Sequence, residues 1–315
     1  MVGLQIGRGS WRVSITAGAH SDEPVGPITA MELAMWLVSK SAEPAYFCAN
    51  YTFYICPQVN PDGAALNAAW FAEPLDAVKY FRSVVREAPG DDIEFGYPGN
   101  GGAALRPENE AVAKFLGLHG PFVFHASLHG MAFAEGAWFL ICEEWAERSA
   151  VLRQTLARLS REAGFPLHDI DRQGDKGFTR IEPGFCTTPT STAMRSHFLD
   201  RDETKTAAQF RPSSMEFVQS LGGDPLLMVS ELPLFMITDP HPRTETRPPV
   251  PGETAYEKFR EALPLARAAF ERGDTQPVET LMQQYRLRAV PTEAQVTLQG
   301  RMVLESAEFA RSRLS

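Results

Sequence analysis

His20 and Glu23 stand three residues apart in the segment AGAHSDE, where an imidazole and a carboxylate could bind one metal ion. Catalytic zinc sites use such ligands, for example two histidines and one glutamate, and keep a fourth position open for water. A motif this short also occurs in ordinary polar surface loops. The zinc interpretation therefore requires a third ligand, a base and a pocket from the rest of the chain.

The segment before this motif has the pattern of a β-strand. Apolar and polar residues alternate from Trp11 to Ala17, and Gly18 ends the alternation. The run from Ile28 to Lys40 indicates a helix soon afterwards. A strand that ends in the loop carrying His20 and Glu23 could direct both side chains to one point above the edge of a sheet.

Two later apolar segments supply further candidates. The segment PFVFHASLHG has the hydrophobicity of a buried strand and ends near His129, while DPLLMVSELPLF contains Glu231. Ligands of α/β sheets bind beyond the carboxyl ends of strands, so these side chains could share a site with His20. A glutamate between apolar neighbours is costly unless it has a partner. If Glu231 does not belong to a metal site, the alternative is that it pairs with a lysine or arginine in the core.

Strands and helices alternate along the chain, which predicts an α/β fold with a mixed, mostly parallel sheet flanked by helices. The polar segment 164–215 is long for a loop, so we expect it to be functional or mobile. We predict one domain over residues 1–238, followed by a proline-rich linker and C-terminal helices over 239–315 that pack on it.

Composition limits the classes of function. The chain has 315 residues, 44% of them hydrophobic, and a net charge of −9, which argues against a nucleic-acid-binding groove. The longest apolar run, 225–237, is too short to span a membrane. Four cysteines without CxxC spacing and no visible secretory signal predict a cytoplasmic protein with reduced thiols. We expect a peptide or small amide substrate, no nucleic-acid or membrane partner, and possible homo-oligomers.

The ordered motifs AGAHSDE, NPDG at 60–63, SLHG and SELPLF, spanning about residues 11–237, resemble the zinc carboxypeptidase family. This resemblance implies a carboxypeptidase-like fold with one zinc ion per chain, bound by His20, Glu23 and His129. It also implies that Glu231 is the general base for a metal-activated water. His125 lies on the same side of its strand as His129 and competes for the third ligand position. We interpret it as a core residue or a neighbour of the ligands.

The resemblance assigns two further roles near the metal. Asp92 matches the aspartate that steadies the first zinc histidine, although a solvated loop acid is the alternative. Arg86, and less favourably Arg82, could stabilise the negative charge that develops on the substrate oxygen. The alternative is that both arginines belong to the surface of a helix.

The chain also departs from the family pattern. Glu94 and Phe95 occupy the positions of the asparagine and arginine that bind a peptide's terminal carboxylate, and no tyrosine occurs between Tyr97 and Tyr256. A carboxylate near Glu94 would meet like charge, so the substrate is expected to present an amide or amine there. Otherwise another arginine, Arg180 or Arg195, must bind the carboxylate.

Only 19 residues precede His20, so we also expect a reduced N-terminal portion, or a second subunit that covers the exposed edge of the sheet. The preferred function is a zinc-dependent amide or peptide hydrolase, carboxypeptidase-like but with altered terminal specificity. The alternatives are an N-acyl amino acid deacylase of the aspartoacylase and succinylglutamate desuccinylase type, and a non-catalytic binding protein on the same fold.

Overall fold

The structure is a computed structural model that describes residues 2–72, 76–91, 93–99, 105–238 and 249–314. Its sheet has the strand order β1-β3-β2-β4-β8-β5-β7-β6, with β9 paired to β8. The strands are β1 (Leu4–Gly7), β2 (Trp11–Ala17), β3 (Tyr51–Cys56), β4 (Phe124–Ala134), β5 (Trp138–Ile141), β6 (Arg180–Glu182), β7 (Phe185–Thr187), β8 (Leu226–Met236) and β9 (Arg288–Ala289). The central strands β3, β2, β4 and β8 pair in parallel, while β1, β5, β6 and β9 each form an antiparallel pair. The predicted mixed α/β fold is confirmed.

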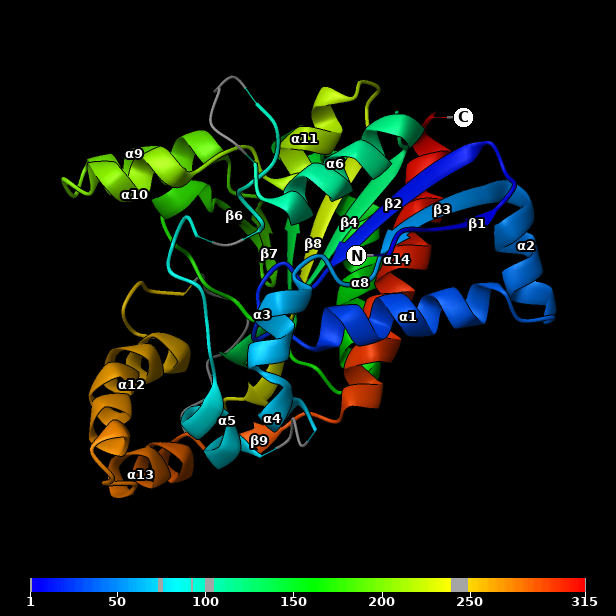
Figure 1. Cartoon of the computed structure of the whole chain (residues 1–315). Helices are drawn as coiled ribbons and strands as arrows, with labels where there is room; N and C mark the ends of the chain where they lie inside the picture. The colour runs from blue at the N-terminus through cyan, green and yellow to red at the C-terminus, as the bar shows by residue number, and fades with distance from the viewer. Residues whose placement is uncertain (1, 73–75, 92, 100–104, 239–248, 315) are drawn as a thin grey trace.

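Helices cover both faces of the sheet (Figure 1). On one face α14 packs against α1, α8, β4 and β8, and on the other α6 and α11 pack against β3, β4 and β8. The helices are α1 (Val25–Leu37), α2 (Ala42–Asn50), α3 (Pro61–Leu66), α4 (Ala68–Phe71), α5 (Ala77–Ser83), α6 (Pro107–His119), α7 (Glu143–Ala146), α8 (Ala150–Glu162), the 3₁₀ helix η1 (Asp175–Gly177), α9 (Ser191–Leu199), α10 (Thr204–Gln209), α11 (Ser214–Ser220), α12 (Ala255–Glu271), α13 (Gln276–Gln284) and α14 (Thr292–Leu314).

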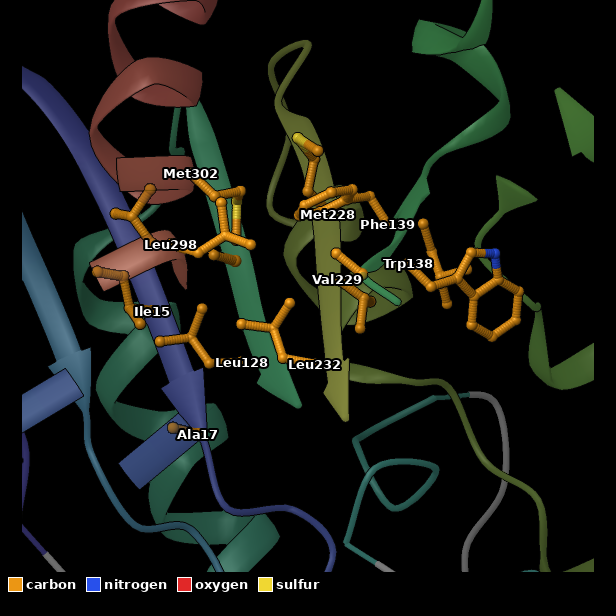
Figure 2. Packing of buried hydrophobic residues seen from close by; sticks show 14 of the residues in the cluster. Ile15, Ala17, Leu128, Trp138, Phe139, Met228, Val229, Leu232, Leu298 and Met302 are labelled. Carbon is orange, nitrogen blue, oxygen red and sulfur yellow. The ribbon is translucent and has the colours of Figure 1, made fainter. Parts of the chain in front are cut away.

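Burial of apolar side chains between the sheet and α14 fixes the central strands. Figure 2 shows Leu298 and Met302 of α14 beside Ile15 of β2 and Leu128 of β4, and all four side chains are buried. Removing such area from water stabilises the fold by roughly 25 cal/mol per Å². The C-terminal helix thus packs on the same sheet as the N-terminal strands.

The alternation of side chains along β4 separates this core from the polar residues. Leu128 faces α14, whereas Ser127 and His129 face the opposite side, because successive strand residues point to opposite faces. On the next strand, Glu231 pairs in register with His129. The parallel pairing of β4 with β8 therefore brings a histidine and a glutamate to adjacent strands at the same height.

Three sequence expectations need further description. The segment NPDG begins a helix rather than forming an isolated turn, because the Asn60 side chain accepts a hydrogen bond from Gly63 N (3.0 Å) and Pro61 occupies the first helical turn. The segment 164–215 contains short strands and helices, β6, β7, η1, α9 and α10, instead of one long loop. Most of the predicted linker, 239–248, lies outside the described residues. Of the helices described, none has the length and apolar character required to cross a membrane.

Candidate metal centre

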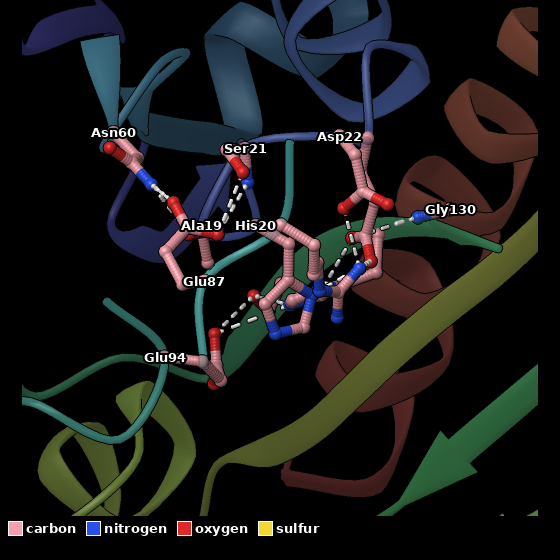
Figure 3. Close-up of polar contacts among 12 residues, drawn as sticks. Ala19, His20, Ser21, Asp22, Asn60, Glu87, Glu94 and Gly130 are labelled. Atoms are coloured by element: carbon pink, nitrogen blue, oxygen red, sulfur yellow. Dashed lines mark hydrogen bonds and ion pairs between the residues drawn. The ribbon is translucent and has the colours of Figure 1, made fainter. Parts of the chain in front are cut away.

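The predicted ligands His20, Glu23 and His129 lie together. His20, labelled in Figure 3, and Glu23 follow the end of β2, whereas His129 lies in the middle of β4, which continues to Ala134 and does not end at His129 as expected. Each offers one ligand atom, and these atoms all lie within 4.8 Å of one another. His20 Nδ1 is 2.7 Å from Glu23 Oε1 and 3.1 Å from His129 Nδ1, while His129 Nδ1 is 2.9 Å from Glu23 Oε2. One ion could therefore contact two imidazole nitrogens and one carboxylate.

Backbone contacts hold this arrangement. Gly18, which follows β2, has a φ of +74°, and a side chain there would collide with Gln58, so the turn into the ligand loop requires glycine. Gly130 N donates to Glu23 Oε2 (3.2 Å), and Gln299 Nε2 of α14 donates to His129 O (2.7 Å). The ligand loop and the middle of β4 are thereby fixed relative to each other.

The ligands stabilise one another electrostatically. Burial alone would raise the pKa of Glu23, but His20, Arg86 and His129 lower it well below its usual value. Burial alone would lower the pKa of His129, but Glu23 and Glu94 raise it well above its usual value. A carboxylate is therefore maintained beside two histidines at neutral pH. Two histidines and one ionised glutamate form a ligand set that zinc accepts.

Glu94 lies on the far side of His129 from the other ligands. Its Oε2 is 3.2 Å from His129 Nε2 and accepts from Ser127 Oγ (3.3 Å), and its Oε1 accepts from Ser214 Oγ of α11 (2.8 Å). Asn109 Nδ2 holds the preceding residue by donating to Ile93 O (2.8 Å). These contacts direct the Glu94 carboxylate towards His129. Figure 3 labels Glu94 and draws its polar contacts as dashed lines.

Glu231 lines the same cavity as the three ligands. Burial, and then the negative charge of Glu23, raise its pKa to about 8. A glutamate with a pKa near neutrality can accept and return a proton, which is the property that a general base requires.

Arg86 lies beside the ligand Glu23. Its Nη1 donates to Asp22 Oδ1 (2.6 Å) and Glu23 Oε1 (2.8 Å), and it lines the cavity. Burial alone would lower the pKa of Arg86, but Glu23 and Asp22 raise it. A permanent cation therefore stands at the metal end of the cavity. Arg82 lines a neighbouring cavity that Arg86 also reaches.

The structure places the other predicted residues as follows. His125 is buried, its Nδ1 is 2.8 Å from Ser14 Oγ, and burial lowers its pKa to about 4. It is therefore a neutral core residue, four residues before the ligand His129 on the same strand. Phe95 lines the cavity and packs against Phe210. Asp92 lies outside the described residues.

The two arginines expected to replace the family's carboxylate-binding residue lie elsewhere. Arg180 binds Asp169 through two hydrogen bonds (2.7 and 3.1 Å), and Arg195 donates to Phe210 O (2.9 Å). Among the described residues, neither lines the cavity that contains the metal ligands. Both side chains already have partners within the fold, which explains why neither extends into the cavity.

The cavity has a volume of about 430 Å³, suited to a small ligand or one end of a larger one. Cationic residues that sequence reasoning did not find also line it, namely Arg172, Lys176 and Arg260. They come from the polar segment 164–215 and from α12, so no local motif could have indicated them. Only the tertiary structure brings them to the metal ligands.

The donor set fits a zinc ion. His20 and Glu23 from the loop after β2 converge with His129 of β4, and the second ring nitrogen of His129 has Ser127 Oγ (2.9 Å) and the carboxylate of Glu94 (3.2 Å) as its partners. Such an outer partner is typical of zinc-bound histidines, because it fixes the ring and its tautomer. A cavity borders the ligands, so the remaining coordination position would be accessible.

Comparisons with known proteins give one family-model match and a set of similar solved structures. Residues 3–134 match the family model described as zinc carboxypeptidase. A metallo-carboxypeptidase from Burkholderia cenocepacia is 12% identical with a TM-score of 0.49, covering 99% of this chain and 61% of its own. A metallo-carboxypeptidase from Pseudomonas aeruginosa is 15% identical with a TM-score of 0.44, covering 96% of this chain and 59% of its own. No curated protein matches. The segment of residues 3–134, less than half of the chain, is thus similar to zinc carboxypeptidases.

Proposed function

We propose that the chain is a zinc-dependent hydrolase of amide or peptide bonds. One observation carries the proposal: two histidines and a glutamate converge at the mouth of a cavity that a second, partly protonated glutamate also lines. His20, Glu23 and His129 would hold the ion. When bound, zinc supplies a Lewis acid and lowers the pKa of water enough for attack on a carbonyl at neutral pH.

The protein's own residues would then move the proton and orient the groups. Glu231 accepts a proton from the attacking water and later delivers it to the leaving amine, which is the role of a general base followed by a general acid. The positive charge of a bound ion would favour the carboxylate form of Glu231 before the reaction. Arg86 contributes a fixed cation at the same end of the cavity, where it can stabilise negative charge developing on the carbonyl oxygen.

We also propose that Glu94 orients His129 and does not contact the substrate. Its two oxygens are engaged by Ser127, Ser214 and the imidazole. The sequence-based reason for expecting an amine or amide opposite Glu94 therefore loses its support. Specificity for the terminal group must depend on other residues of the cavity.

The test is hydrolysis by the zinc-loaded protein of blocked and unblocked dipeptides and of N-acyl amino acids. Glu231→Gln should keep the fold and the zinc but lower turnover roughly 100-fold or more, because the general base is lost. Glu308→Gln is the matched control, since Glu308 is a partly buried glutamate of α14 that accepts from Tyr51 (2.8 Å), and it should have no effect. Zinc binding without hydrolysis of any substrate would favour the alternative of a non-catalytic binding protein.

A further inference from the structure

Three cationic side chains from separate segments line the cavity of the metal centre. Arg172 precedes η1, Lys176 lies within η1, and Arg260 lies on α12. None of the three side chains forms a hydrogen bond or an ion pair with the part of the chain that the structure describes; the contacts they make are with aromatic rings. The chain as a whole carries a net charge of −9, so the cluster does not follow from its average composition.

Aromatic rings support Arg172. Its guanidinium carbon lies 4.4 Å from the centre of the Phe178 ring and 5.3 Å from that of Trp138, and these two rings stack on each other at 5.5 Å. A guanidinium held over rings loses little freedom on binding and can still present its N–H edge to both oxygens of a carboxylate. Phe178 and Trp138 also line the cavity.

Lys176 is held in a conformation that most side chains avoid. Its φ is +56°, in the left-handed region, and Gln173 nearby has a φ of +52°. Backbone conformations of this kind concentrate at functional sites. Burial, and then the charge of Arg172, lower the pKa of Lys176, with Arg260 acting in the same direction. An anion bound among these cations would relieve their mutual repulsion.

The carboxylates of the cavity are engaged at its metal end. Glu23 contacts both ligand histidines, and Glu94 contacts His129 and two serines. Glu87 accepts from Ser21 and Asn60. The charges that act most strongly on the pKa of Glu231 are those of Glu23, His129, His20 and Arg86. The cavity therefore has an acidic end that binds the metal and a cationic wall whose charges are available to a ligand.

We propose that Arg172, Lys176 and Arg260 form a subsite for a carboxylate, so that the ligand of this cavity carries an anionic group facing this wall. That this ligand is a substrate rests on the proposed hydrolase function. The carboxylate would accept hydrogen bonds from Arg172 and Lys176, with Arg260 contributing charge from the more exposed side of the cavity. A small amide whose acidic side chain, and not its terminal carboxylate, faces this wall is the substrate class that follows.

The first test needs no metal and no reaction. Succinate and its uncharged analogue succinamide are titrated calorimetrically into the metal-free protein. Succinate should bind at least about tenfold more tightly, and Arg172→Gln and Lys176→Met should each weaken it about tenfold, the effect of losing one charged hydrogen bond. Arg260→Gln, on an exposed helical position, should weaken it less. Arg158→Gln removes an exposed arginine that pairs with Glu162 on α8 and should have no effect.

Equal binding of succinate and succinamide, or unchanged succinate binding by the Arg172→Gln/Lys176→Met double variant with native circular dichroism, would overturn the subsite. The second test compares kcat/KM of the zinc-loaded protein for N-acetyl dipeptides ending in glutamate or glutamine. Hydrolysis without a preference for glutamate contradicts the subsite and leaves the hydrolase intact. Normal succinate binding with no hydrolysis of either peptide contradicts the hydrolase and leaves the subsite intact.

Discussion

Replacement of Glu94 by glutamine tests whether this residue orients His129 or contacts the substrate. In the structure one carboxylate oxygen lies 3.2 Å from His129 Nε2 and the other accepts from Ser214 (2.8 Å). When zinc occupies Nδ1 of a neutral histidine, Nε2 must carry the proton, so the carboxylate accepts a charge-assisted hydrogen bond. Glutamine is almost the same size but cannot supply that charge.

The expected loss follows from the possible orientations of the new amide. If its NH₂ faces His129, two donors oppose each other and the hydrogen bond is lost. If its oxygen faces His129, a neutral hydrogen bond remains and only the charge is lost. Hydrogen bonds to charged groups contribute about 1.5–3 kcal/mol. Zinc affinity should therefore fall about 10- to 100-fold, as found for other outer partners of zinc ligands.

Competition for zinc against a chromogenic chelator measures this affinity, and Glu308→Gln is the control glutamate remote from the site. If Glu94 instead binds the substrate, Glu94→Gln will keep the zinc affinity within about twofold and change KM. That result would refute the orienting role. A loss of zinc affinity with unchanged unfolding free energy of the metal-free protein would support it, because a merely structural role would lower both.

Further predictions concern the ligands, the base and the arginine. His129→Ala should abolish stoichiometric zinc binding, whereas His125→Ala should keep it and lower stability through a buried cavity; metal analysis showing the reverse would contradict the ligand assignment. In the metal-free protein the pKa of Glu231 is raised to about 8. The stabilising contribution of protonated Glu231 is therefore complete below the pKa that this residue has in the unfolded chain, and it is lost as the pH rises through 8. Glu231→Gln should therefore raise the free energy of unfolding at pH 9, by roughly 4 kcal/mol, but not at pH 4, which urea titrations at both pH values would test. Arg86→Gln should lower kcat about 100-fold with little change in KM, and a change in KM alone would exclude a role in stabilising the transition state.

Sequence reasoning could predict the metal centre because its residues follow local rules. His20 and Glu23 follow a strand with strict alternation, and His129 and Glu231 stand in apolar strands. Parallel pairing of β4 with β8 then places His129 beside Glu231 within the two strands, although the sequence reasoning expected His129 at a strand end. The mixed sheet was predictable for the same reason. Its antiparallel outer strands were not, because edge pairing depends on turns and partners that the alternation of residues does not specify.

The role of Glu94 could not be predicted from its position. Alignment of its loop with the family pattern indicated a residue facing the substrate, but Ser214 on α11 and Ser127 on β4 hold its carboxylate against His129. These contacts join segments more than thirty residues apart in sequence. A hydrogen-bond network of this kind has no periodicity and no motif, so only the folded chain shows which way the side chain points.

Recognition of charge in this cavity follows from the same arrangement. A carboxylate beside Glu94 would meet negative charge from the metal-binding end, where Glu23 and Glu231 also lie. An anionic group on the ligand is best stabilised against the cationic wall, where Arg172 and Lys176 form no ion pair with a described residue, although Asp175 acts electrostatically on Lys176. The separation of charge within the cavity would therefore orient an acidic ligand, with its anionic group on the cationic wall and its scissile amide towards Glu231. A cationic group facing Arg172 and Lys176 would be repelled, so this wall would select an anionic ligand and set its direction.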